Sequence, residues 1–193
     1  MSKVVVVATR NKGKLKEFRA MLEPNGYEVK GIDDIDATLP DVVEDADTFE
    51  GNALKKAREF SKALGVAVVS DDSGLCVDAL GGAPGVYSAR YAGENAGDEA
   101  NLAKVLAELK GDTSPGQYVC VLAYVDGEQE VVVRGECEGE LITERRGTGG
   151  FGYDPIFYVE QYGHTMAELT MEEKNAISHR ALALKRLISQ LTL

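Results

Sequence analysis

The chain has 193 residues, of which 44% are hydrophobic and 27% are charged, as is usual for a globular domain with a sizeable core. Its 21 basic and 32 acidic residues give a net charge of −11 at pH 7, which argues against binding to nucleic acid or to anionic membranes. We expect neither a membrane span nor a secretory signal, because every apolar run is short. Its 3 cysteines lack a metal-binding spacing, so we expect no disulfide framework and a reducing, cytoplasmic environment.

The first predicted elements are a strand, a cationic loop and a helix. Residues 4–8 form a β-branched run that is typical of a strand covered on both faces. In the helix that follows, Leu15, Phe18 and Leu22 share one side. The unpaired N–H groups and positive dipole of a helix N-terminus bind phosphate, although lysines here also suit a solvated helix face. The loop does not match the G-x-x-x-x-G-K-[ST] pattern, so we do not expect a Walker-type ATPase.

An acidic segment and a long helix come next. Residues 27–32 predict a short strand, and residues 33–47 predict a solvated, irregular loop of which one or two acids could face a neighbouring site. Asp47 and Glu50 have the spacing of a capping box, which predicts a helix that reaches about Leu64 and ends at Gly65. Asn52 lies early in this helix and has no evident structural role.

The central motif is Ser70-Asp71-Asp72-Ser73-Gly74, which directly follows the apolar run 66–69. We predict a buried strand that ends at the two acids, which places carboxylates at the end of a sheet, where open α/β sheets hold ligands. Paired carboxylates suit Mg²⁺, which takes oxygen ligands and shares them with substrate phosphates. A simple turn is the alternative, since Asp, Ser and Gly are common turn residues.

The middle of the chain predicts a segment of strand length, a loop, a helix and a hairpin. The apolar segment 75–80 leads into a long glycine-rich loop over residues 81–93, and such loops are often functional. Asp98 is expected to cap a helix that ends at Lys110. Residues 117–126 and 129–142 predict two strands around Asp126-Gly127, a hairpin turn signal.

A second glycine-rich loop, residues 148–155, precedes the last predicted helix. Phe151 and Tyr153 offer flat faces for a nucleotide base and Asp154 offers acceptor oxygens, but aromatic rings packed into the core would give the same pattern. Thr170 and Glu173 form a second capping box, which predicts one helix through Gln190.

Four motifs in this order resemble the inosine/xanthosine triphosphate pyrophosphatase family, which is Ham1-like and is also called house-cleaning purine nucleotide pyrophosphatases. They are Thr9-x-Asn11-x-x-Lys14, Ser70–Gly74, Gly147–Pro155 and Ser178-His179-Arg180. The resemblance covers nearly the whole chain and implies an α/β fold in a single domain over residues 1–193, with a mixed β-sheet flanked by helices, two lobes and a central active-site cleft. It also implies hydrolysis of ITP, dITP and XTP to the monophosphate and pyrophosphate with Mg²⁺, usually by a homodimer.

The resemblance also implies roles for individual residues. Glu44 and Asp72 would bind Mg²⁺, and Asp72 would accept a proton from the attacking water; a metal-bound carboxylate is a weak base, so whether Asp71 or Asp72 is the base stays open. Donors on Lys174, His179 or Arg180 that point at the C6 keto oxygen would favour hypoxanthine and xanthine over adenine. The residues expected to bind substrate are Thr9, Arg10, Asn11, Lys12, Gly13, Lys14, Ser73, Phe151, Gly152, Tyr153, Asp154, Lys174, His179 and Arg180.

Two alternative functions stay open. A Maf-like pyrophosphatase would act on other nucleotides, although the Gly-Phe-Gly-Tyr-Asp loop and the Ser-His-Arg segment argue against it. A nucleotide-binding regulator would keep the phosphate and base contacts without turnover, and the presence of Asp71, Asp72 and Glu44 favours an enzyme instead.

Overall fold

The structure is a computed structural model that describes residues 2–191. The chain forms two compact units. Unit 1 contains the residues up to Asp72, Cys120–Gly135 and the residues from Arg180 onward, and unit 2 contains Ser73–Val119 and Glu136–His179. The chain therefore passes between the units at four points, and two of these, Asp72–Ser73 and His179–Arg180, lie in predicted site motifs.

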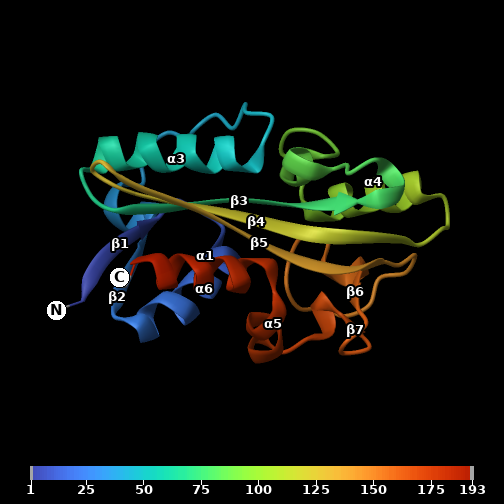
Figure 1. The fold of residues 1–193 in the computed structure, drawn as a ribbon. Coiled ribbons are helices and arrows are strands. Elements are labelled where there is room, and N and C mark those ends of the chain that lie inside the picture. The colour runs from blue at the N-terminus through green and yellow to red at the C-terminus, as the bar shows by residue number, and fades with distance from the viewer. Residues whose placement is uncertain (1, 192–193) are drawn as a thin grey trace. The chain divides into compact units, whose positions relative to one another are not determined.

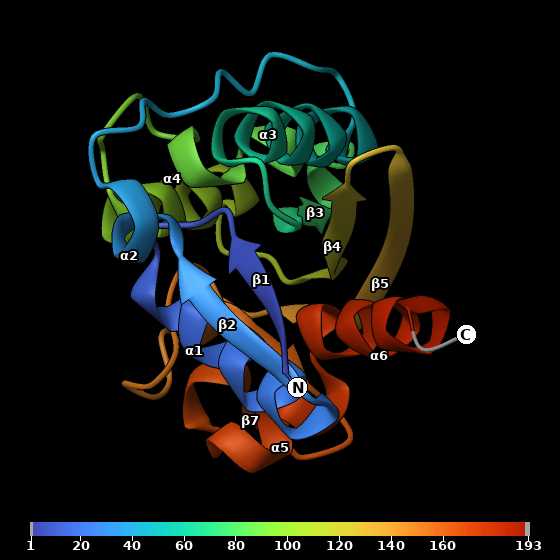
Figure 2. The same ribbon diagram turned by 90° about the vertical axis from the view of Figure 1, so that its left-hand side faces the viewer.

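A mixed sheet with the strand order β2-β1-β3-β4-β5-β6-β7 confirms the predicted α/β fold (Figure 1). Strand β1 pairs in parallel with β2 and β3, as Figure 2 shows for β1 and β2, whereas β6 pairs antiparallel with β5 and β7. The strands are β1 (Lys3–Val7), β2 (Tyr27–Gly31), β3 (Val68–Val77), β4 (Ser114–Asp126), β5 (Gln129–Leu141), β6 (Phe157–Val159) and β7 (His164–Thr165). The hairpin predicted around Asp126-Gly127 is the β4–β5 connection.

Unit 1 has helices on both faces of its strands. Helices α1 (Lys12–Leu22) and α6 (His179–Leu191) lie on one face and α3 (Phe49–Leu64) on the other (Figure 1). Phe18 and Leu184 belong to the cluster that joins α1 and α6 to the strands, and for α1 this confirms that the predicted apolar side of the helix is buried. Helix α3 ends at Gly65 in a left-handed conformation with φ 67°, as the sequence predicted.

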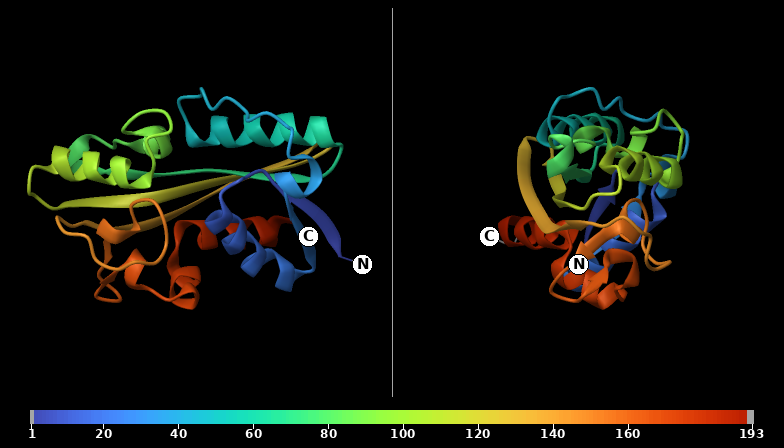
Figure 3. Two further views of the ribbon diagram at one scale, coloured as in Figure 1. Left: turned by 180° about the vertical axis from the view of Figure 1, so that it is seen from behind. Right: turned by 90° about the vertical axis from the view of Figure 1, so that its right-hand side faces the viewer.

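Unit 2 has α4 (Asp98–Leu109) on one side of its strands and α5 (Met171–Ile177) on the other (Figure 3). Its core contains Leu75 of β3, Leu102 of α4 and Tyr118 of β4. The shorter elements of the chain are helix α2 (Ile32–Asp36) and the 3₁₀ turns Glu23–Asn25, Asp78–Leu80, Gly85–Arg90, Asp154–Ile156 and Met166–Glu168. Among the residues the structure describes, no helix is long and apolar enough to cross a membrane.

Strand β3 corrects the prediction that a strand ends at Asp71. The strand continues through both acids to Val77, so Ser70–Gly74 is a mid-strand segment and not a turn. Buried carboxylates are tolerated in a strand when cations or hydrogen-bond donors face them, and the side chains that do so come from segments far away in the sequence. A local turn signal was therefore overruled by tertiary contacts.

The other predictions that the structure corrects concern the residues at which helices begin and end. The helix predicted from Thr170 through Gln190 is two helices, because Ser178 is extended with ψ 152° between α5 and α6. Thr170 does form the predicted capping box with Glu173. Helix α3 is capped by Thr48 and not by Asp47, since the Thr48 hydroxyl accepts from the backbone N–H of Gly51. The predicted solvated loop 33–47 begins inside α2.

Candidate active site

The cationic loop of unit 1 lies directly before α1 and is held by its own side chains. Asn11 caps the helix, with its Oδ1 accepting from the backbone N–H of Lys14 at 3.0 Å. The Thr9 hydroxyl in turn accepts from the backbone N–H of Asn11 at 3.1 Å. These bonds fix the path of the backbone before any ligand binds, and Lys12 and Gly13 occupy the first turn of α1.

Arg10 is engaged by the acidic segment that follows β2. Its Nε lies 3.0 Å from Asp33 Oδ1, its Nη2 donates to the carbonyl of Leu39 at 2.6 Å, and its Nη1 pairs with Asp41. Arg10 therefore ties this segment to the cationic loop, and it would have to exchange these partners in order to bind a phosphate.

Asp71 belongs to a buried ion cluster. Its Oδ1 lies 3.2 Å from Lys14 Nζ and its Oδ2 lies 3.4 Å from Arg180 Nη2, while the Arg180 guanidinium also pairs with Glu17. Arg180, Glu17 and Asp71 are all buried. Burial opposes the charge on Arg180, but the carboxylates of Asp71 and Glu17 raise the pKa of its guanidinium above the usual value, so it stays charged. Arg180 thus links α6 to α1 and to β3 within unit 1.

Asp72 lies in a different environment from its neighbour. Its Oδ2 accepts from the Asn52 side-chain amide at 3.1 Å. Burial, together with the charges on Glu44 and Asp71, raises the pKa of Asp72 to about 7 against the opposing effects of Asn52 and Lys56. Asp72 is therefore a carboxyl group that exchanges its proton near neutral pH.

Lys56 connects Glu44 to the strand. Its ammonium pairs with the Glu44 carboxylate and donates to the backbone carbonyl of Asp71 at 2.9 Å. Burial opposes its charge, but Asp71 and Glu44 raise the pKa of Lys56 overall. The acidic segment thus brings Glu44, the sequence-predicted metal ligand, to the Asp72 side of the cluster.

In unit 2, Asp154 is the centre of the glycine-rich loop. Its Oδ1 accepts from the Tyr118 hydroxyl at 2.9 Å, and its Oδ2 accepts from Lys174 Nζ at 2.8 Å and from the backbone N–H of Phe151 at 3.2 Å. Lys174 Nζ also lies 4.6 Å from the centre of the Phe151 ring. Gly150 is required here, because its φ is +69° and a Cβ would lie 2.1 Å from Asp154 Oδ2.

The remaining residues of this loop are anchored to unit 2. Tyr153 is buried and its hydroxyl donates to the carbonyl of Ser88 at 2.6 Å, so its ring belongs to the core and is not a free stacking face. The backbone N–H of Gly152 donates to Asp98 Oδ2 at 3.0 Å. Asp98, which we expected to cap α4, is the first residue of that helix and instead fixes the loop.

The comparisons with known proteins agree with this geometry. The model of the Ham1 family matches residues 5–190. The chain belongs to the Ham1 family. It is similar to a dITP/XTP pyrophosphatase of Bacillus licheniformis, with 53% identity covering 96% of each chain, and to one of Bacillus subtilis, with 52% identity covering 96% of this chain and 95% of that protein.

Solved structures of the Ham1 family share the fold. The Ham1 protein of Staphylococcus aureus has a TM-score of 0.86 and 44% identity, and a HAM1 protein from Coxiella burnetii has a TM-score of 0.88 and 40% identity. Each match covers 98% of both chains. Because the alignments are nearly full length, both units of this Ham1-family chain are represented in these relatives.

Three polar residues of unit 1 belong to the site of this Ham1-family chain and were not predicted. Asn52 and Lys56 lie one turn apart on α3 and contact Asp72 and the Asp71 carbonyl, and Glu17 pairs with Arg180. The helical pattern could have revealed two of them. Asn52 and Glu17 fall on the apolar faces of their helices, where a polar side chain needs a buried partner.

The carboxylates of unit 1 suit a metal ion that takes most of its ligands from water and substrate. No cluster of three potential His, Cys, Asp or Glu ligands is found in the part of the chain that the structure describes. Mg²⁺, however, is bound through one or two carboxylates and takes its other oxygens from water and phosphate. Asp72 and Glu44 supply two carboxylates, and the charge on Glu44 is one of the causes, after burial, that raise the pKa of Asp72. The donor chemistry therefore suits a hard cation.

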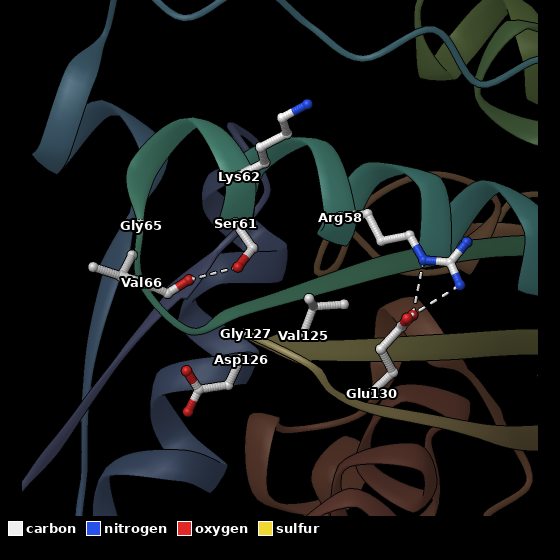
Figure 4. A pocket seen from close by; sticks show the side chains of 9 residues that line it. All are labelled: Arg58, Ser61, Lys62, Gly65, Val66, Val125, Asp126, Gly127 and Glu130. Atoms are coloured by element: carbon white, nitrogen blue, oxygen red, sulfur yellow. Dashed lines mark hydrogen bonds and ion pairs between the residues drawn. The ribbon is translucent and has the colours of Figure 1, made fainter.

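A pocket of about 440 Å³ lies elsewhere in unit 1, between the end of α3 and the β4–β5 hairpin (Figure 4). Arg58 and Glu130 form an ion pair in it, with Nε and Oε2 2.8 Å apart. None of the predicted site residues lines it. The pocket therefore does not mark the active site of this Ham1-family chain.

Proposed function

We propose that the chain hydrolyses the deaminated purine nucleotides dITP, XTP and ITP to the monophosphate and pyrophosphate. The observation that carries the proposal is the nearly full-length similarity to proteins named dITP/XTP pyrophosphatase at 53% and 52% identity. The chemistry of both residue clusters supports it, because unit 1 supplies cations and carboxylates for a polyphosphate, and unit 2 supplies a ring and a donor for a base.

In unit 1, the loop Thr9–Lys14 binds the triphosphate through backbone N–H groups of the α1 N-terminus and through Lys14. Asp72 and Glu44 would hold Mg²⁺, which would supply neutralisation of phosphate charge and polarisation of the phosphoryl group when bound. Asp72 would accept a proton from the attacking water; in the metal-free protein its pKa is raised to about 7, the direction that makes a carboxylate a better base. Asp71 is engaged by Lys14 and Arg180 and serves to position them.

In unit 2, Phe151 and Lys174 bind the base. The Phe151 ring offers a face for stacking, and Lys174, held by Asp154, donates to the C6 keto oxygen of hypoxanthine or xanthine. Adenine carries an amino donor at C6, which would face the ammonium without an acceptor between them, so ATP is rejected. His179 and Arg180 complete the set of base-selecting donors, while Ser73 and Gly152 contact the nucleotide from strand β3 and from the loop.

We also propose that residues 1–193 form a single nucleotide pyrophosphatase domain. Two motifs support this proposal: Asp72 and Ser73 are consecutive residues, as are His179 and Arg180, and in each pair one residue belongs to each unit. A homodimer in the cytoplasm is part of the proposal.

The test is a substrate panel of dITP, XTP, ITP, GTP and ATP, with Mg²⁺ or with a chelator, in which both pyrophosphate and monophosphate are measured. We expect equal amounts of the two products from dITP and XTP, little turnover of ATP, and loss of activity with chelator or in Asp72→Asn. Binding of ITP without release of pyrophosphate would instead show a regulator. Turnover restricted to other nucleotides would favour a Maf-like enzyme.

A further inference from the structure

Tyr118 connects two separate parts of the base-binding cluster in unit 2. It lies on β4 and is buried, with 6% of its surface exposed. Its hydroxyl donates to Asp154 Oδ1 at 2.9 Å. Its ring stacks on the imidazole of His179, with ring centres 4.6 Å apart and planes inclined by 15°. Tyr118 therefore contacts both Asp154 and His179, which lie 25 positions apart in the sequence.

The hydroxyl has a role that core packing does not explain. A phenylalanine would fill the same space and keep the stack on His179 and the contact with Phe157. The hydroxyl is directed at the carboxylate whose other oxygen accepts from Lys174 Nζ and from the Phe151 backbone N–H. Because rotation about the terminal torsion of an aspartate is nearly free, a carboxylate with donors on one oxygen alone can turn. Donors on both oxygens fix its plane.

We propose that Tyr118 is a positioning residue for base recognition: it fixes Asp154, and through Asp154 it aims the Lys174 ammonium and holds the Phe151 loop. This inference rests on the proposed function, because Lys174 and Phe151 are the groups assigned to the base. Tyr118 itself is buried and acts only through its neighbours.

The consequence for kinetics is specific. The base lies at the opposite end of the nucleotide from the bond that is cleaved, so a misaimed Lys174 weakens binding of substrate and transition state alike, which raises KM and leaves kcat nearly unchanged. A hydrogen bond to a charged group corresponds to roughly a tenfold change in affinity or more. Discrimination between dITP and dATP should fall by a similar factor. A displaced Lys174 weakens the hydrogen bond to the C6 keto oxygen, which only dITP has, and leaves the stacking of the base unchanged.

Tyr118→Phe is the test, and Tyr124→Phe is its matched control. Tyr124 is on the same strand, is also buried, and its hydroxyl lies 3.3 Å from the carboxylate of Asp126, which is outside the proposed site. We expect Tyr118→Phe to raise KM for dITP about tenfold with kcat within about twofold of the wild type, and Tyr124→Phe to change neither. Hydrogen exchange of a peptide that covers residues 147–154 should be faster in Tyr118→Phe alone.

The outcomes separate the inference from the proposed function. A wild-type protein that cleaves none of the nucleotides refutes the proposed function. An active wild type with identical KM values in both tyrosine variants refutes the role of Tyr118, and so does a loss confined to kcat. If Tyr118→Phe does not fold, Asp154→Asn tests the same link from the other side: we expect a raised KM and reduced discrimination, and unchanged values would overturn the inference.

Discussion

Replacing Asp72 with asparagine should stabilise the metal-free protein at alkaline pH while it abolishes hydrolysis. Asp72 is buried near Glu44 and Asp71, and these surroundings disfavour its charged form. Asparagine has the shape of the protonated acid, and its side-chain oxygen can still accept from Asn52. The substitution therefore removes a charge that folding must bury, together with the proposed general base.

The size of the effect follows from the pKa of Asp72, which is raised from 3.8 to about 7. Between these values the folded state binds more protons than the unfolded state, so the free energy of unfolding falls as pH rises through this range. At 1.36 kcal/mol for each pKa unit, the loss is about 4 kcal/mol and is complete above roughly pH 8. For a chain of this length, that corresponds to a difference in Tm of about 8–16 °C.

The assay is thermal unfolding of wild type, Asp72→Asn and Asp112→Asn, an exposed carboxyl control, at pH 5 and pH 8.5 in the presence of a chelator. We expect the Tm of Asp72→Asn to exceed that of the wild type by much more at pH 8.5 than at pH 5, where only about 1.6 kcal/mol of the loss has occurred, with the control following the wild type. Equal Tm differences at the two pH values would refute the reasoning, because Asp72 would then not be the group that takes up the proton.

Three further substitutions test the assignments in unit 1. Arg180→Ala should lower the free energy of unfolding by about 3–5 kcal/mol in urea titrations, because Glu17 and Asp71 are left buried without their cation; it should also reduce hydrolysis of ITP more than that of ATP, and equal losses would contradict its role in selectivity. Asn52→Ala removes a hydrogen bond that lowers the pKa of Asp72, so the acid limb of the kcat/KM profile should move to higher pH; an unmoved limb would show that Asp72 is not the group observed. Arg58→Ala should change stability by less than about 1 kcal/mol and leave the kinetics unchanged, since its ion pair with Glu130 is exposed; a slower enzyme would place function at the pocket in Figure 4.

Strands β1, β2, β4 and β5 and helices α1, α3 and α4 were predictable because their signals are local. The β-branched run 4–8 and the Asp126-Gly127 turn each specify an element without reference to the rest of the chain. The break at Ser178 was not predictable in this way. No Pro or Gly marks it, and the helical pattern continues across it, yet Ser178 is extended where the chain passes from unit 2 to unit 1. Tertiary structure decided that boundary, as it often overrides propensity.

In the candidate site, too, the residues with a local sequence signal were predicted and those that depend on tertiary contacts were not. Lys14, Asp72 and Asp154 were identified by motif, but motifs do not include the supporting residues that lie elsewhere in sequence. Asn52 could have been recognised, because it falls between Phe49 and Ala53 on the buried face of α3 and an amide there needs partners. Lys56 could not, since a lysine on a helix is usually solvated and its partners come from the acidic segment and from β3.

The adjacent acids of β3 could be assigned different roles only once the strand was seen to pass through them. Successive side chains of a strand point to opposite faces of the sheet. Asp71 accordingly meets Lys14 and Arg180, whereas Asp72 meets Asn52 of α3. A turn would have allowed both carboxylates to face one ion, but a strand forbids it. The acid that shares its face with α3 and Glu44 is thus the one available to a metal and to water, and the other anchors the cations.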